Sequence, residues 1–307
     1  MGKKYTSIGG QALIEGVMMR NGKKVAMAVR KGDGEIEIKR EVHAPKWKNI
    51  GKIPLLRGVA ALVGSMAVGV KALTWSAEFF EDGTEEEPES KLEVWMKEKF
   101  GKKADDIMIA FSMVFAVIMA FSLFGVLPTL IISFTKRWVS DPLMLSAMEG
   151  IMKIVMFVSY VAAISMMKDI KRVFQYHGAE HKVIYAYESG EELTVENARK
   201  YTRLHPRCGT SFLLIVLTMS IIIFSFVSWS SPLTRIGLKL VFFPIIAGLS
   251  FEIIKFTGKH DNSLVNMITW PGLMMQKLTT KEPDDSQLEV AIASLKAVLD
   301  DEEEAVS

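Results

Sequence analysis

The sequence predicts an α-helical polytopic membrane protein with about four transmembrane helices, a small N-terminal antiparallel β-meander and cytosolic amphipathic helices. Two observations carry this prediction: long apolar runs without charge, and a turn-rich N-terminal segment with short apolar stretches. Half of the residues are hydrophobic, and the net charge is only +2. Such a small net charge, without a basic stripe interleaved with aromatic residues, argues against nucleic acid as a partner.

Four apolar runs are candidates for membrane spans. Residues 107–134 and 209–234 contain no charged residue, and the first of these runs is 28 residues long. A helix needs roughly 20 residues to cross a bilayer, so both runs are long enough. The runs 145–167 and 236–254 are less uniform, because they carry Glu149, Lys153, Lys239 and Glu252. Charges near the end of a span can reach the headgroups, so we expect these side chains to extend to the membrane surface.

The basic residues predict the orientation. The connection between the second and third spans carries eight of them: Lys168, Lys171, Arg172, Lys182, Arg199, Lys200, Arg203 and Arg207. The other two connections carry only Lys136 and Arg137, and Arg235. Since basic loops prefer the cytoplasm, we expect both termini and this long loop to face the cytosol. The single cysteine, Cys208, would then lie in a reducing compartment, and it has no second cysteine with which to form an intramolecular disulfide.

Residues 1–52 are expected to form a cytosolic sheet. An apolar stretch at 12–20 is followed by Asn21-Gly22, a second stretch at 25–30, the turn Gly32-Asp33-Gly34, and alternation at 35–38. Asn-Gly and Asp-Gly pairs favour tight hairpin turns. The pattern therefore predicts a meander of three strands.

The remaining chain divides by composition. Residues 53–76 predict an amphipathic helix that lies on the membrane or re-enters it, because only 13 uncharged residues separate Arg57 from Lys71; a fifth crossing is the alternative. Residues 77–104 combine an acidic linker at 81–90 with a juxtamembrane helix. The first two spans occupy 105–167, a cytosolic loop 168–210, and the last two spans 211–255. Residues 256–307 predict a cytosolic amphipathic region, with a helix at 287–299 and an acidic tail.

The loop 168–210 concentrates the residues that bind transition metals. His177, Glu180 and His181 share one face if the segment is helical, since positions i, i+3 and i+4 are neighbours. His205 and Cys208 follow 24 or more residues after His181. Four donors, His177, His181, His205 and Cys208, would complete a tetrahedral site for zinc or a similar metal, with Glu180 as a supporting carboxylate.

Two other interpretations of the same residues remain open. The letters His-x-x-Glu-His also match the inverted zinc-protease pattern, in which Glu180 would activate water. That chemistry needs an open coordination position, so either His205 or Cys208, but not both, would be the third ligand. Alternatively, the histidines cap helices or contact lipid phosphates without a metal, and Cys208 is a buried apolar residue.

Three blocks of the sequence resemble one family. Residues 9–20, 176–182 and 205–212 are similar to the signature blocks of a bacterial membrane family called domain of unknown function 1385. The resemblance implies a bacterial membrane protein of a family described as predicted metal-dependent enzymes. Four further residues of these blocks are candidates to support the cluster: Glu15, Arg20, Lys182 and Arg207. Of these, Glu15 and Arg20 are either solvated strand residues or reach the histidines if the sheet packs over the loop.

The first expected function is non-catalytic. A cytosolic cap organised by the His/Cys cluster would bind and regulate another membrane or ribosome-associated assembly, such as a protein-translocation channel, from the bacterial plasma membrane. The alternative is a membrane-bound metal-dependent hydrolase with a cytosol-facing zinc-type site and Glu180 as general base. Transport is the least favoured function, because the first and third spans contain no charged group at mid-membrane depth.

Overall fold

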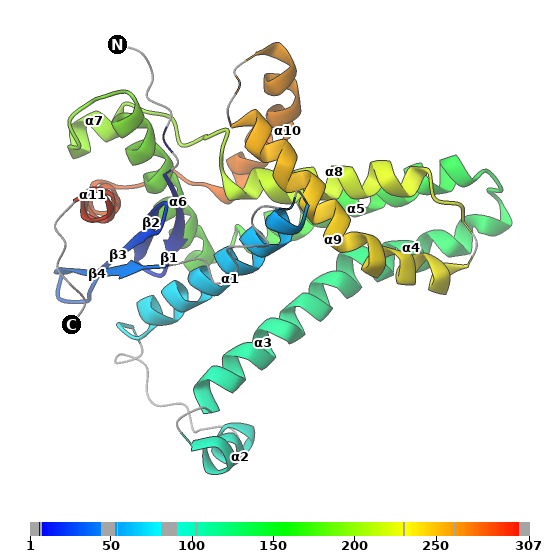
Figure 1. The fold of residues 1–307 in the computed structure, drawn as a ribbon, viewed down its shortest axis with the longest axis horizontal. Helices are drawn as coiled ribbons and strands as arrows, with labels where there is room; N and C mark the ends of the chain where they lie inside the picture. Colours follow the sequence, from blue (N-terminus) through cyan, green and yellow to red (C-terminus); the bar gives the residue numbers. More distant parts are fainter. Residues whose placement is uncertain are drawn as a thin grey trace. The chain divides into compact units, whose positions relative to one another are not determined.

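The computed structural model describes residues 6, 8–43, 53, 55–80, 91–101, 104–229, 231–258, 260 and 262–300. The predicted acidic linker at 81–90 and the acidic tail beyond residue 300 lie outside these ranges. The chain forms two compact units. Unit 1 comprises residues 1–81, 158–219 and 244–307, and unit 2 comprises residues 82–157 and 220–243. Figure 1 shows the elements of both.

Unit 1 contains an antiparallel sheet of four strands in the order β1-β2-β3-β4. These strands are β1 (Gly9–Leu13), β2 (Gly16–Asn21), β3 (Lys24–Arg30) and β4 (Ile36–Val42). The predicted meander is confirmed, but the predicted number of strands is wrong. The stretch expected to be one strand is a hairpin, because Glu15 adopts a positive φ of 49° and reverses the chain. No Asn-Gly or Asp-Gly pair signals that turn in the sequence.

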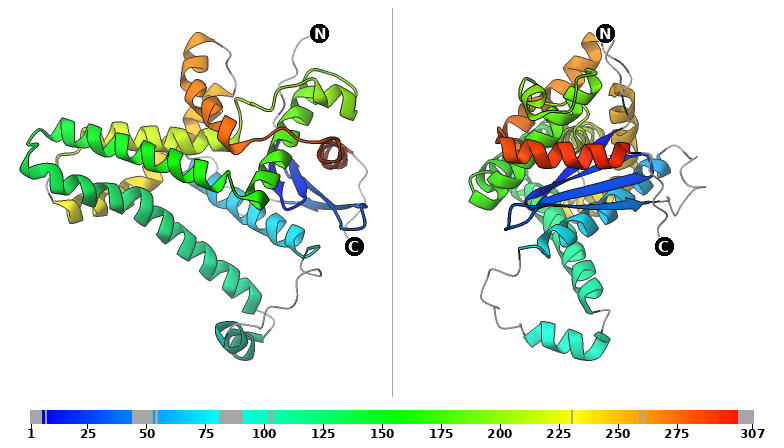
Figure 2. Two further views of the ribbon diagram at one scale, coloured as in Figure 1. Left: turned by 180° about the vertical axis from the view of Figure 1, so that it is seen from behind. Right: turned by 90° about the vertical axis from the view of Figure 1, so that its left-hand side faces the viewer.

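The sheet buries both faces. On one face, Val17, Met19, Ala26 and Ala28 pack against α6 (Lys168–Glu188) and α11 (Asp285–Leu299). On the other, Leu13, Met18, Val25, Met27 and Val29 pack against α1 (Leu56–Ala77). Figure 2 shows α11 and α1 on opposite sides of the strands. The predicted C-terminal helix is confirmed as α11, which begins with a capping box at Asp284 and Gln287.

Helix α1 has two different halves. Towards its C-terminus, Val68, Ala72, Leu73 and Trp75 contact the sheet. Towards its N-terminus, apolar side chains such as Val63 and Met66 are 46% and 40% exposed. By length and composition the whole helix is long and apolar enough to cross a membrane. The C-terminal half of α1 packs on the sheet. Two predictions for this helix therefore remain: it lies on the membrane or re-enters it, or it crosses the membrane fully.

Among the described residues, four helical segments are long and apolar enough to cross a membrane: α1, residues 107–137, α5 (Pro142–Ile164) and α9 (Pro232–Thr257). Residues 107–137 contain most of α3 (Ala104–Phe121), then η4 (Ser122–Val126), α4 (Leu127–Ser133) and η5 (Phe134–Arg137). The predicted run at 209–234 forms a shorter apolar helix, α8 (Gly209–Ser225). The remaining helices are α2 (Lys91–Phe100), α7 (Val195–Arg199) and α10 (Ser263–Thr279). The chain is therefore a mostly helical membrane protein whose apolar helices contact lipid.

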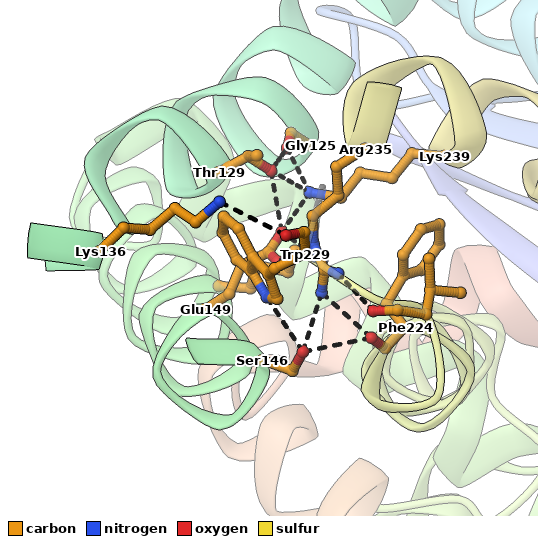
Figure 3. A network of polar contacts seen from close by, with 11 residues as sticks. Gly125, Thr129, Lys136, Ser146, Glu149, Phe224, Trp229, Arg235 and Lys239 are labelled. Atoms are coloured by element: carbon orange, nitrogen blue, oxygen red, sulfur yellow. Dashed lines mark hydrogen bonds and ion pairs between the residues drawn. The ribbon is translucent and has the colours of Figure 1, made fainter. Parts of the chain in front are cut away.

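Unit 2 buries a network of charged side chains (Figure 3). Glu149 bonds to Arg235 Nε over 2.8 Å, to Lys153 over 3.3 Å, and to Lys239. Arg235 also donates to the carbonyl oxygens of Val227 and Phe224. The four charged residues are at most 5% exposed. The expectation that Glu149, Lys153 and Lys239 extend to the membrane surface is therefore wrong. Their ends meet each other inside the unit, where each charge has an opposite partner.

Candidate metal centre

Helix α6 and the start of α8 bring three metal-binding side chains together. Donor atoms of His177, His181 and Cys208 all lie within 4.8 Å of one another. His177 and His181 are one turn apart on α6, and Cys208 directly precedes α8. His177 Nε2 lies 3.1 Å from Cys208 Sγ. Donors of a tetrahedral zinc ion are roughly 3.5 Å apart, given metal–donor bonds of about 2.0–2.3 Å, so the spacing fits such an ion.

Backbone carbonyls fix the orientation of both imidazoles. His177 Nδ1 donates to Thr279 O over 2.8 Å, and His181 Nδ1 donates to Arg203 O over 2.6 Å. A carbonyl oxygen only accepts, so Nδ1 of each ring carries the proton and Nε2 of each neutral ring presents a lone pair. His181 Nε2 is buried and has no hydrogen-bond partner among the described residues. This is the arrangement that orients histidines for metal binding.

Gly178 permits the contact that holds His177. A Cβ at residue 178 would overlap the carbonyl oxygen of Lys281, so only glycine lets the segment after α10 lie against α6. Lys281 N donates to Phe174 O over 2.8 Å in the same segment. That close approach carries Thr279 O to His177. Gly178 is therefore needed for the position of the His177 ring.

Glu180 lies between the cluster and strand β1. A Cβ at Gly10 would be 2.8 Å from Glu180 Cδ, and the backbone N–H of Gly10 donates to the carboxylate. Burial raises the pKa of Glu180 to about 8, while nearby His177 acts in the opposite direction. Glu180 Oε2 is buried without a hydrogen-bond partner among the described residues. An unsatisfied carboxylate oxygen is costly, so a bound group beside it would be stabilising.

Burial also changes the protonation of the donors. It lowers the pKa of His181, which favours the neutral ring that a metal requires. Burial by itself raises the pKa of Cys208, but its contacts with the His181 ring and hydrogen bonds from Thr210 outweigh burial and lower that pKa. The thiolate is the form that binds metals. The donor set therefore fits zinc or a similar transition metal.

His205 lies beside the cluster but faces a different group. Its Nδ1 accepts from Arg207 N over 3.3 Å, and its Nε2 is 3.8 Å from Glu188 Oε2. The rings of His181 and His205 are 5.5 Å apart between centroids. Gln276 of α10 clamps the backbone of His205 on both sides, accepting from its N–H and donating to its carbonyl oxygen. The structure thus brings together three of the four sequence-predicted donors, and His205 lies outside this group.

The supporting residues take separate positions. Glu15 bonds to Arg172 and accepts from the hydroxyl of Tyr176, so it reaches α6 one turn before the cluster. Arg20 donates to Gly22 O and lines a cavity on the other face of the sheet. Lys182 connects α6 to Arg199 O and Glu282, while Arg207 connects Thr6 O to Glu188.

Several residues of the site escaped the sequence analysis: Gly10, Gly178, Arg203, Gln276 and Thr279. Arg203 and Thr279 act through their backbone oxygens, which carry no sequence signal. Gly10 and Gly178 lie inside the resembling blocks, and a glycine within a strand or helix is the one signal that could have indicated a close approach.

Comparison with known proteins gives the family but no activity. The model of a family described as "Protein of unknown function (DUF1385)" matches residues 53–301. The "Uncharacterized protein YqhQ" of Bacillus subtilis (strain 168) is 36% identical over 294 residues, which cover 95% of this chain and 92% of that protein. No solved structure matches the chain. The family resemblance is confirmed, and the chain belongs to the DUF1385 family of proteins of unknown function.

Proposed function

We propose that this protein is a membrane-bound metal-dependent hydrolase whose metal centre is formed by His177, His181 and Cys208. One observation carries the proposal: two imidazole Nε2 lone pairs and a thiol sulfur converge, and backbone carbonyls hold the rings in that orientation. Three protein donors with one open position are typical of catalytic zinc sites, whereas structural sites use four. The basic loop 168–210 favours the cytosolic side of a bacterial plasma membrane.

Each residue has a separate role in this proposal. A divalent transition metal held by the three donors would supply Lewis acidity that polarises the bond to be hydrolysed. Burial raises the pKa of Glu180 to about 8, and a bound metal cation would lower it again, so that the carboxylate could take a proton at Oε2, the oxygen that has no partner among the described residues. The carbonyls of Thr279 and Arg203 keep the imidazoles in position, so little reorganisation is needed when a substrate binds.

Elemental analysis of the purified full chain tests the metal centre. We expect about one zinc or similar ion per chain, and its loss in His177→Ala, His181→Ala and Cys208→Ala variants. His205→Ala is the matched control, because its nitrogens face Glu188 and Arg207 N. Metal loss in the His205→Ala variant as complete as in the other three would contradict a three-donor centre.

The Glu180→Gln variant separates catalysis from a structural role. We expect it to keep the metal and to abolish the hydrolytic activity or the cellular phenotype of the protein, because glutamine accepts no proton at that position. A Glu180→Gln variant that keeps metal and function would contradict the hydrolase. That outcome would favour the other expectation, a metal site that organises a docking surface for a membrane or ribosome-associated assembly.

A further inference from the structure

A cavity of about 370 Å³ lies on the α1 face of the sheet. Its lining comes from β1, β2, the turn that follows and α1: Gly9, Gly10, Gln11, Met18, Arg20, Gly22, Ser65 and Val68. Gln11 holds α1 close to β1 by donating to Gly69 O over 3.5 Å. Gly9 and Gly10 put no side chain into this space. The cavity is therefore built from the N-terminal family block together with one helix.

Arg20 gives the cavity its chemical character. Among the described residues that line the cavity, it is the only one with a formal charge. Its guanidinium donates from Nε to Gly22 O over 3.0 Å and makes no other hydrogen bond or ion pair with the described residues. Both terminal nitrogens are thus left for a ligand, in the fork that binds a carboxylate or phosphate through two hydrogen bonds.

The cavity also lies beside apolar helix surface. Ser65 and Val68 belong to the part of α1 where exposed apolar residues give way to residues packed on the sheet. Met66, between them, is 40% exposed. An oxyanion bound at Arg20 would therefore have apolar surface of α1 next to it, which suits the headgroup of an amphiphilic molecule.

The backbone of Gly10 lies between the cavity and Glu180. Gly10 lines the cavity, and on its other side a Cβ would be 2.8 Å from Glu180 Cδ. Any larger residue at this position would displace the Glu180 carboxylate. Strand β1 therefore lies between the cavity and the candidate metal centre.

We infer that this cavity binds an oxyanion group, a phosphate or carboxylate, through Arg20. The cavity lies across strand β1 from Glu180, so oxyanion binding does not need the metal. Two sources share this chemistry, a phospholipid headgroup and a water-soluble anion. The following experiment distinguishes them.

Footprinting of arginines on the metal-free full chain tests the inference. The protein in dodecyl maltoside, a detergent without phosphate, is treated with phenylglyoxal, and modification is quantified at Arg20 and, as control, at Arg199, which pairs with Asp285 on the surface. We expect at least fivefold slower modification of Arg20 alone, either with added inorganic phosphate, which indicates a soluble anion, or with phosphatidylglycerol in the micelles, which indicates a headgroup. Equal modification of Arg20 under all conditions would overturn the inference.

A cavity-filling variant provides the second measurement. Gly9→Leu would put a side chain into the cavity, because a Cβ there meets nothing within 4 Å, and it should abolish the protection of Arg20. Gly32→Leu is the matched control, since a Cβ at Gly32 is equally free but outside the lining. Protection that survives Gly9→Leu would contradict this location. If the protein as purified contains no metal but the anion protects Arg20, only the hydrolase proposal is contradicted. If the purified protein contains metal but no anion protects Arg20, only the anion-binding cavity is contradicted.

Discussion

The hydroxyl of Tyr176 donates to Glu15 Oε2 over 3.1 Å, which joins the turn of the first hairpin to the residue that precedes His177. Glu15 also receives Arg172 Nη2 over 2.5 Å. Glu15 has a positive φ of 49°, a backbone conformation that residues other than glycine rarely adopt. These contacts stabilise a strained turn and fix the sheet beside α6.

Two substitutions of Glu15 should separate the effect of backbone strain on stability from the effect of the contacts with α6. Glu15→Gly loses the bonds to α6 but relieves the positive φ, whereas Glu15→Ala loses the bonds and keeps the strain. We expect Glu15→Ala to be less stable than Glu15→Gly by about 1 kcal/mol. Thermal unfolding of both variants, followed by circular dichroism in detergent, measures the difference. Equal stability of the two variants would mean that the backbone at residue 15 is not strained.

Gly178→Ala should weaken metal binding without removing any donor. The added Cβ would push the segment around Lys281 away from α6, and Thr279 O would no longer orient His177. Loss of such an orienting contact lowers metal affinity by about 10–100-fold. Competition with a chromophoric chelator measures the affinity. Gly237→Ala is the control, because a Cβ in that helix meets nothing within 4 Å and should leave the affinity unchanged.

Glu188 should give the protein a defined response to acid. Burial acts to raise its pKa, but bonds from His205, Thr6 and Arg207 prevail and lower it to about 2. The unfolded value is about 4.3. A carboxyl with a depressed folded-state pKa stabilises the fold above the unfolded value, and the stabilisation is lost as the pH falls through the folded value.

The Glu188→Gln variant tests that sign. We expect it to be less stable than the native chain at pH 7 by roughly 1–3 kcal/mol, as for hydrogen bonds to a charged group. The difference should shrink between about pH 4.3 and pH 2, as the native carboxylate becomes protonated. Thermal unfolding at a series of pH values is the measurement. A stability difference that grows on acidification would contradict the assignment.

Substitutions in the buried network of unit 2 should lower the stability by unequal amounts. Glu149 is the one carboxylate that Lys153, Arg235 and Lys239 share, so Glu149→Gln leaves buried cations unpaired and should cost about 3–5 kcal/mol. Lys153→Met should change the stability by less than about 1 kcal/mol, because it removes one of three cations that share a single carboxylate. Thermal unfolding in nanodiscs compares the two. If Lys153→Met lowers the stability as much as Glu149→Gln does, the three cations do not share Glu149 in this way.

The sequence by itself determined the parts of this protein that depend on local pattern. Long apolar runs gave the helices of 107–137, α5 and α9, the turn pair Asn21-Gly22 gave the β2–β3 hairpin, and helical spacing gave the shared face of His177 and His181. The Ile14–Glu15 turn could not be predicted, because contacts from α6 rather than a turn residue hold it.

Only the tertiary structure decided how the side chains of the candidate metal centre are oriented. Thr279 O orients His177 from 102 positions further along the chain, and Gln276 turns the His205 backbone from 71 positions away. Packing likewise placed Gly10 against Glu180 and enclosed Glu149 among cations that the sequence would have left at the membrane surface. The physical reason is common to all of these: a hydrogen bond or ion pair between distant residues forms only after burial has brought their elements together. Residue spacing predicts a face of a helix, but not the group that this face meets.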